Sequence, residues 1–384
     1  MAKSRSILPQ VRCALWGRAA GHCEFEGCPR FVSYHPETKE AVNIAEAAHI
    51  IGFSENGPRG EGELSEELAQ DVANLMLLCG ICHTTIDRNK ENYPVERLRR
   101  MKRAHERWVE RVVSIGRERE SHILLYGANV GDHSSAVSYR AAAPALIADG
   151  RYPASSVPIE LSTIHGSFRD RTEQFWQVES EHLRRAVRER VLEPLAMRSI
   201  SHLSVFALAP QPLLTLLGYL LGDINYEAQV YQLHREPPGW SWQEHPDGFE
   251  YVVHEPNGAR GQPALVLALS ATITDDRIHA VLGDDAAIWR ITVPEPNNDF
   301  LKSLRQLQQF RQMMRPLLDR IKATHGQKAL LHVFPAAPVS IAVELGRVIM
   351  PKADMPLRIY DQNNDRGGFV HALDTGTTQG GSND

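Results

Sequence analysis

All five cysteines of this 384-residue chain lie within its first 82 positions. Four of them form two closely spaced pairs, Cys23 with Cys28 and Cys79 with Cys82, and the remaining one is Cys13. Two such pairs, brought together by folding, supply the four thiolates of a structural zinc site. A disulfide scaffold is hard to reconcile with so uneven a distribution. We therefore predict a small zinc-stabilised domain joined to a larger domain with an ordinary core, and we expect Cys13 to be a buried apolar residue.

The composition fits an ordinary globular protein, with 42% hydrophobic and 23% charged residues and a net charge of −5. This charge does not favour nucleic-acid binding by the whole chain, so any DNA affinity must come from a local basic surface. The longest apolar runs, 213–222 and 264–273, are too short to span a membrane. Arg12 and Arg18 interrupt any signal-peptide core. We expect a cytoplasmic protein without a membrane partner, in which cysteines bind metal rather than form disulfides.

Local patterns predict the order of elements in the N-terminal part. We expect a helix over 11–20, a solvated insertion over 54–71, a buried strand over 73–78, a helix from His83 and a basic helix over 95–113. Charged residues near 114–121 mark the boundary between domains 1–118 and 119–384. The tail after about residue 374 is polar and predicted to be disordered.

The C-terminal part contains an internal repeat. Val205, Phe206, Ala209 and Pro210 recur 128 positions later, and so do Leu217 and Gly218. Each copy predicts a buried strand, a sharp turn and a helix with proline near its first position. A strand containing Tyr231 or Tyr360 follows each copy. The repeat indicates two Rossmann-like units related by a pseudo-twofold axis.

Three further residues around the cysteines point to phosphodiester hydrolysis, which needs a general base and a metal ion. Taken singly, His49 is more simply a hydrogen-bonded core histidine, Asn74 is uninformative, and His83 only begins a helix. In the order His, Asn, Cys-x2-Cys-His, however, residues 10–110 resemble an HNH endonuclease. The resemblance implies a ββα-metal fold in which a hairpin and a helix hold one divalent ion. It also implies that His49 is the general base, that Asn74 orients the site and that His83 is the final residue of the motif.

Two positions depart from the family pattern. Ala48 stands where many members have an acidic metal ligand, and Asp87 stands where many have a second helical histidine. His83 and Asp87 are four residues apart on one helix, so both could reach the same ion. Which of them binds it stays open. The expected ion is magnesium or manganese.

The basic helix is a candidate surface for the DNA backbone. A solvated helical face is an equally good interpretation of this pattern. Residues 1–110 contain fifteen Lys and Arg against sixteen Asp and Glu, so one nuclease domain should hold DNA weakly. Oligomerisation would then add affinity. The candidate contacts are Arg97, Arg100, Lys102 and Arg103.

The turns of the repeat are candidate ligand sites, because helix N-termini at the carboxyl ends of strands bind phosphates. The alternative is that proline and glycine only shape the turns, and that the phenylalanines belong to the core. Tyrosine and tryptophan nearby could stack on bases. The candidate ligand contacts are Phe206, Pro210, Gln211, Tyr231, Trp240, Trp242, Phe334, Pro338 and Ser340.

Residues 120–372 resemble the SAVED domain, a fusion of two CARF-like units that binds cyclic oligonucleotides. An HNH domain followed by SAVED is similar to the effectors of bacterial anti-phage signalling (CBASS). The resemblance implies a double-stranded DNA endonuclease with little sequence preference, activated by a cyclic di- or trinucleotide. It also implies ligand-promoted homo-oligomers, from dimers to tetramers.

Two other interpretations remain. One is a restriction-type HNH endonuclease whose C-terminal domain recognises modified DNA. The other is a zinc-stabilised DNA-binding or scaffold protein without catalysis.

Overall fold

The computed structural model describes residues 6–35, 37–129, 137–162, 172–197, 199–222, 226–258, 260–363 and 365–376. The chain divides into two compact units, Met1–Gly116 and Arg117–Asp384, which are treated separately below. The boundary expected from the sequence, between residues 118 and 119, lies two positions further on. Most of the tail predicted to be disordered, residues 377–384, lies outside the described residues.

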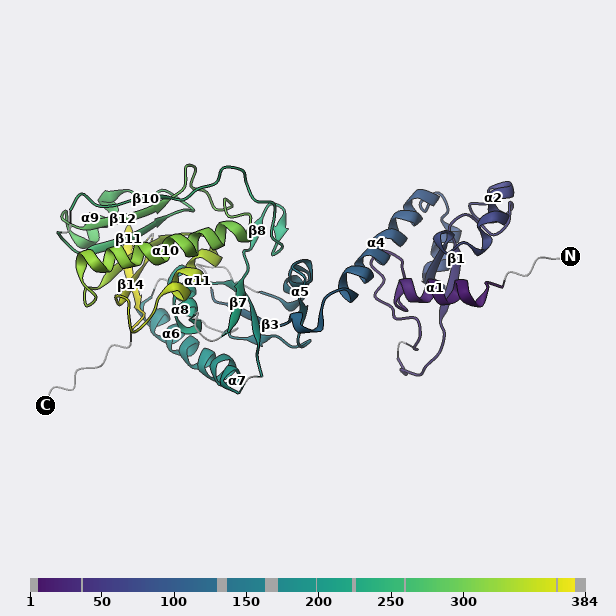
Figure 1. Ribbon diagram of the computed structural model, residues 1–384, viewed down its shortest axis with the longest axis horizontal. Coiled ribbons are helices and arrows are strands. Elements are labelled where there is room, and N and C mark those ends of the chain that lie inside the picture. Colours follow the sequence, from purple (N-terminus) through teal and green to yellow (C-terminus); the bar gives the residue numbers. More distant parts are fainter. Residues whose placement is uncertain are drawn as a thin grey trace. The chain divides into compact units, whose positions relative to one another are not determined.

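The first unit is small and combines one hairpin with helices (Figure 1). Its elements are α1 (Pro9–Ala19), β1 (Ala45–His49), α2 (Gly62–Glu67), η1 (Leu68–Gln70), η2 (Val72–Asn74), β2 (Leu75–Cys79), α3 (Gly80–Arg88) and α4 (Val95–Val113). Strands β1 and β2 pair antiparallel, with His49 opposite Leu75 and Ala45 opposite Cys79. Since α3 follows β2 directly, hairpin and helix form the predicted ββα arrangement.

Burial explains why this hairpin holds together. All five residues of β2 are buried, and they pack with Leu15 of α1, Ile86 of α3 and Leu98 of α4. The insertion over 54–71, expected to be solvated, folds into α2 and the short 3-10 helix η1, and η2 follows it directly. Gly52 and Gly60 lie so close to neighbouring backbone that a Cβ on either would overlap it.

The second unit contains the remaining elements. These are η3 (Arg117–Arg119), β3 (Glu120–Gly127), α5 (Tyr139–Ala148), β4 (Tyr152–Pro153), β5 (Ile159–Glu160), α6 (Glu173–Val187), the π-helix η4 (Arg188–Leu192), α7 (Glu193–Ala196), β6 (His202–Leu208), α8 (Gln211–Leu221), β7 (Glu227–Val230), β8 (His234–Arg235), β9 (Pro238–Gly239), β10 (Val252–His254), β11 (Pro263–Ala268), α9 (Asp275–Leu282), β12 (Ala287–Thr292), α10 (Leu304–His325), β13 (Leu331–Ala336), α11 (Val339–Val348), β14 (Leu357–Asn363) and β15 (Gly368–Asp374).

Two sheets organise this unit. The first has the order β4-β3-β6-β7, with β5 also on β3, and all its pairings are parallel. The second has the order β10-β12-β11-β13-β14-β15, with antiparallel strands at both edges. Strands β6 and β13, which begin the two copies of the repeat, lie inside their sheets and are almost wholly buried. Such strands read as continuous apolar runs, as this sequence does.

The repeat is visible in side-chain packing. Phe206 stacks on Tyr231 with ring centroids 4.3 Å apart, and Phe334 stacks on Tyr360 at 4.5 Å. Trp240 meets Phe206 edge-on, as Phe369 meets Phe334. The pseudo-twofold relation predicted from the repeat therefore extends to the aromatic core of each half.

The repeated glycines lie where helices α8 and α11 cross. A Cβ on Gly218 would overlap the Val343 carbonyl, and one on Gly346 would overlap the Thr215 carbonyl. Both glycines permit a close approach of the two helix backbones, which joins the halves into one unit.

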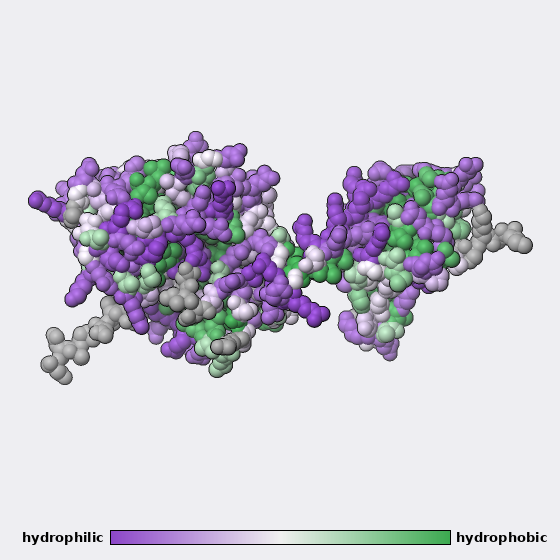
Figure 2. All heavy atoms as spheres, in the orientation of Figure 1, coloured by the Kyte–Doolittle hydropathy of each residue, from purple (hydrophilic) through white to green (hydrophobic). Residues whose placement is uncertain are grey.

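The visible surface is predominantly hydrophilic (Figure 2). Among the described residues, none of the helices combines the length and apolar character needed to cross a bilayer.

Candidate zinc site and active site

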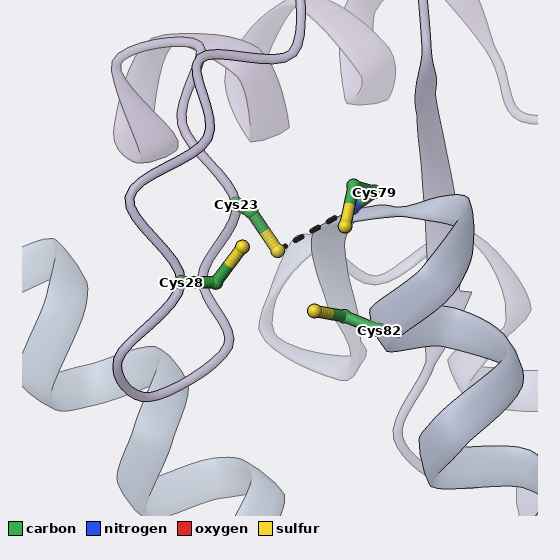
Figure 3. A group of neighbouring side chains, drawn as sticks. All are labelled: Cys23, Cys28, Cys79 and Cys82. Carbon is green, nitrogen blue, oxygen red and sulfur yellow. Dashed lines mark hydrogen bonds between the residues drawn. The ribbon is translucent and has the colours of Figure 1, made fainter. Parts of the chain in front are cut away.

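The four paired cysteines meet in the first unit (Figure 3). Cys23 and Cys28 lie in the loop after α1, Cys79 ends β2, and Cys82 lies in the first turn of α3. Their sulfur atoms all lie within 4.8 Å of one another. Tetrahedral zinc with Zn–S bonds of about 2.3 Å separates its sulfurs by about 3.8 Å, so the cluster fits this ion.

Two hydrogen bonds reach sulfur atoms of the cluster, and the pKa shifts of its cysteines differ: burial raises the pKa of Cys23 to about 12, whereas that of Cys79 is lowered. The Cys79 amide donates to the Cys23 sulfur at 3.4 Å, and Arg30 Nη1 donates to the Cys79 sulfur at 3.4 Å. Burial acts to raise the pKa of Cys79, but hydrogen bonds from Cys82 and Arg30 lower it to about 7. Arg30 therefore contacts one of the cysteine ligands from outside the cluster, which the sequence analysis did not predict. Cys13 is exposed rather than buried, because the α1 face that carries it is turned to solvent, so that prediction was wrong.

Asn74 fastens the end of β1. Its side-chain Oδ1 accepts from the Ile51 amide at 2.8 Å, and its Nδ2 donates to the carbonyls of Ile51 and Leu68. The residue is buried, with 4% of its surface exposed. An apolar side chain here would leave backbone groups without partners, which costs about 1–3 kcal/mol for each group.

His49 is half-buried at the end of the strand that Asn74 secures. Its Nε2 lies 3.1 Å from the Ala69 carbonyl oxygen, and its ring meets Phe53 edge-on. Because a carbonyl only accepts, the neutral ring must carry its proton on Nε2, with the lone pair on Nδ1. This tautomer suits a general base.

A line of charged side chains joins the hairpin to α3. His83 Nδ1 contacts Glu46 of β1, and His83 Nε2 lies 3.3 Å from an Asp87 carboxylate oxygen. The structure thus brings His83 and Asp87 together, as their spacing predicted. It adds Glu46, which the sequence reasoning missed. Glu46 and Ala48 are two residues apart on a strand and share a face, so Glu46 supplies an acidic group on the side where Ala48 lacks one.

Arg59 binds Asp87, the last of these charged residues. Its guanidinium, in a side chain only 6% exposed, donates to the Ile50 carbonyl at 3.0 Å, the Ile86 carbonyl at 2.9 Å and Asp87 at 2.8 Å. It therefore ties the end of β1 to α3 and orients the Asp87 carboxylate. The sequence signal was weak, because Arg59 lies inside an insertion rich in Gly, Pro and Glu.

The basic residues of α4 differ in availability. Lys102 is buried, 2.8 Å from Glu106 and 3.7 Å from Glu24. A DNA contact through Lys102 would have to break this network. Arg97 lies over the Tyr93 ring and donates to the Asn92 carbonyl, whereas Arg100 and Arg103 are exposed.

The candidate ligand contacts in the second unit fall into two groups. The rings of Phe206, Tyr231, Trp240 and Phe334 pack in the aromatic cores, and a ligand could reach them only after that packing opened. The others lie at or near the turns. Pro210 and Pro338 cap α8 and α11, and Trp242 is half-buried against Tyr231.

Two glutamines of the first half contact the start of α11 in the second half. Gln211 accepts from the Ala337 amide at 3.1 Å, and Gln232 accepts from the Ser340 hydroxyl at 2.8 Å. Gln211 and Ser340 were expected at a ligand site; in this structure they connect the two halves. Gln232 was not foreseen.

Comparison with known proteins gives two family matches. Residues 183–374 match the "SMODS-associated and fused to various effectors sensor domain" (SAVED), and residues 19–90 match "HNH endonuclease". No curated protein matches the chain.

Solved structures give distant likenesses to Cap4 SAVED/CARF-domain containing receptors. The Acinetobacter baumannii receptor with the cyclic trinucleotide 2'3'3'-cAAA is 13% identical; the match covers 82% of this chain and 67% of that chain, with a TM-score of 0.41. The same receptor with 3'3'3'-cAAA is also 13% identical; the match covers 83% of this chain and 67% of that chain, with a TM-score of 0.40. The Moraxella osloensis receptor is 11% identical; the match covers 83% of this chain and 70% of that chain, with a TM-score of 0.38.

Proposed function

Because the chain belongs to the SAVED sensor family and carries an HNH endonuclease domain ahead of the sensor, we propose that it is a DNA endonuclease controlled by a cyclic nucleotide. It cuts double-stranded DNA with little sequence preference, after a cyclic di- or trinucleotide binds the sensor. Its role is that of an effector in anti-phage abortive infection. The presence of a nuclease unit and a sensor unit in one chain carries this proposal.

In the nuclease unit, His49 Nδ1 accepts the proton of the attacking water. Asn74 keeps His49 in place by clamping the backbone that follows β1. His83, Asp87 and Glu46 hold the divalent ion; two carboxylates around one imidazole form a donor set suited to magnesium or manganese. When bound, the ion stabilises the negative charge that develops on the phosphate.

The four cysteines hold structural zinc and fix the start of α3, which carries His83. Among the described residues they are the only group of three or more His, Cys, Asp or Glu whose ligand atoms all lie within 4.8 Å of one another. His83 contacts Glu46 through Nδ1 and Asp87 through Nε2, so the two carboxylates lie at different sides of its ring, and we propose that the three groups rearrange around the ion only in the active state.

In the sensor, we propose that ligand contacts lie at the turns before α8 and α11 and near Trp242. The bonds of Gln211 and Gln232 make the halves respond together, since they cross from one half to the other. Ligand binding then promotes dimers to tetramers that bring nuclease units together on both DNA strands.

A plasmid assay with the full chain tests the chemistry. We expect cutting only with magnesium or manganese, ends without a common sequence, and no cutting by His49→Ala. Glu46→Gln should raise the ion concentration needed, whereas the exposed control Arg18→Ala should not. Cutting confined to modified DNA would instead favour the restriction-type function, and retained cutting by His49→Ala would remove His49 as the base.

A further inference from the structure

Glu46, His83 and Asp87 are called the reactive line below, and an exposed face of α3 begins beside them and continues around the helix. Successive residues of an α-helix turn by about 100°, so Thr84 and Arg88 lie roughly a quarter turn around α3 from the edge that carries His83 and Asp87. The opposite face, with Ile86, is buried. Thr84 and Arg88 are exposed, so this side of α3 is open to a DNA strand that continues past His83 and Asp87.

A depression of about 780 Å³ lies against this face. Three segments of the chain line it: Arg30 follows the first cysteine pair, His35 and Ile44 come from the segment before β1, and Ile81 and Arg88 come from α3. Gly80 lies at its edge, and a Cβ there would be 3.1 Å from a Glu46 carboxylate oxygen. The depression therefore borders the reactive line.

Its polar lining consists largely of donors. Arg88 is exposed and has no ion-pair or hydrogen-bond partner among the residues that the structure describes. Arg30 uses one of its five N–H groups on the Cys79 sulfur. His35 Nδ1 accepts from the Thr38 amide at 3.2 Å, so the neutral ring carries its proton on Nε2 and can donate from there.

The apolar part of the lining suits sugar rings. Ile81 is 63% exposed although it lies in a helix beside a buried core. No aspartate or glutamate is among the described residues that line the depression. The cavity beside α4, in contrast, is lined by Glu24 and Glu26 as well as by arginines. Of the two surfaces, the α3 depression is the one without an acidic residue in its lining, although Glu46 borders it.

We propose that the α3 depression binds the DNA sugar–phosphate backbone next to the phosphate that is cut, with Arg88 and Arg30 as phosphate contacts. The inference rests on DNA being the substrate. Arg88 is then a positioning residue, since it anchors a neighbouring phosphate and does not touch the reacting atoms.

Salt dependence of DNA binding tests this directly. Each phosphate contact contributes about 0.9 to the slope of log K against log salt for duplex DNA. The full chain with His49→Ala, which prevents cutting, is titrated with a short labelled duplex at several salt concentrations. We expect Arg88→Ala to weaken binding and lower the slope by about 0.9, and Arg30→Ala with Arg88→Ala to lower it by about 1.8.

Arg18→Ala on α1 is the matched control, because Arg18 is also exposed and its loss changes the net charge equally. The proposal is overturned if Arg88→Ala gives the same slope as Arg18→Ala, or if the parent protein shows no salt-dependent DNA binding at low salt. Zinc content shows whether Arg30→Ala has disturbed the cysteine cluster. Plasmid cutting by the chain with His49 intact is measured in parallel. If this chain cuts DNA but the slopes do not change, only the proposed binding surface is contradicted; if it does not cut, the proposed nuclease function is contradicted.

Discussion

At the scale of single residues, sequence order singles out candidate reactive residues more readily than the residues that support them. His49, Asn74 and His83 carried a recognisable pattern, and the structure adds Glu46 and Arg59 around them. Glu46 could be recognised as a candidate only from the structure, in which it shares a strand face with Ala48. Arg59 could not be predicted, because its three bonds join segments that are distant in the sequence.

Burial also explains which predicted contacts are unavailable. Lys102 resembles its basic neighbours in sequence, but it lies on the face of α4 that packs against Glu24. Burial raises the pKa of Glu24 to about 7, although Lys102 acts in the opposite direction. When every turn of a basic helix contains arginine, a single sequence does not reveal which face of the helix packs against the core.

His202 makes stability in the second unit depend on pH. Burial, together with Arg151, Arg119 and Arg347, lowers its pKa to about 3 from an ordinary 6.5. The unfolded state therefore binds more protons between these values, so stability is full above pH 6.5 and falls as the pH drops towards 3. The effect amounts to a few kcal/mol at most, roughly 1.4 kcal/mol for each pKa unit.

Denaturant unfolding from pH 7 to 4 measures this effect. His202→Gln should lose less stability on acidification than the parent, while the exposed His254→Gln should follow the parent. Parallel curves for His202→Gln and the parent would contradict the assignment.

At the scale of elements, the repeat predicted strands and helices well because each copy repeats a complete packing unit. The basic helix expected over 95–113 is α4, at the same bounds. The insertion over 54–71 was less predictable. Its glycines and acidic residues indicated solvent exposure, whereas Gly60 within it and Gly52 just before it are needed for close backbone packing.

The α8–α11 crossing gives a prediction for this scale. Gly218→Ala or Gly346→Ala should destabilise the second unit by about 1–3 kcal/mol, as overpacking does, because Cβ would overlap backbone that cannot move aside. Gly17 lies in α1 with open space around it, so Gly17→Ala should be neutral or gain up to about 1 kcal/mol in its own unit. Thermal unfolding compares the three variants. A stable Gly218→Ala protein would show that the crossing is not tightly packed.

At the scale of the whole molecule, the chain joins an HNH endonuclease unit to a SAVED sensor unit. The uneven cysteine distribution predicted this division, because all five cysteines lie in the smaller unit. Calorimetry of the full chain should show two transitions, and a zinc chelator should lower the first while leaving the second in place. If the chelator moved neither transition, the cysteine cluster would not hold a stabilising metal.

A host-toxic nuclease must be nearly silent without its signal. Moving the active fraction from 1% to 99% requires about 10⁴-fold tighter ligand binding to the active state, or roughly 5.5 kcal/mol. Under the proposed function, the contacts of a cyclic nucleotide with the sensor would have to supply this difference. Neither the linkage nor the bases can be read from the aromatic residues, because most of their rings are core.

The most direct test is the rate of plasmid cutting by the full chain with magnesium, with and without each member of a panel of cyclic di- and trinucleotides. The account predicts that at least one ligand raises the rate about 100-fold, the change expected from 1% to 99% active protein. The same ligand should raise the melting temperature of His49→Ala without restoring cutting. Equal rates with every ligand and with none would contradict control of the nuclease by the sensor.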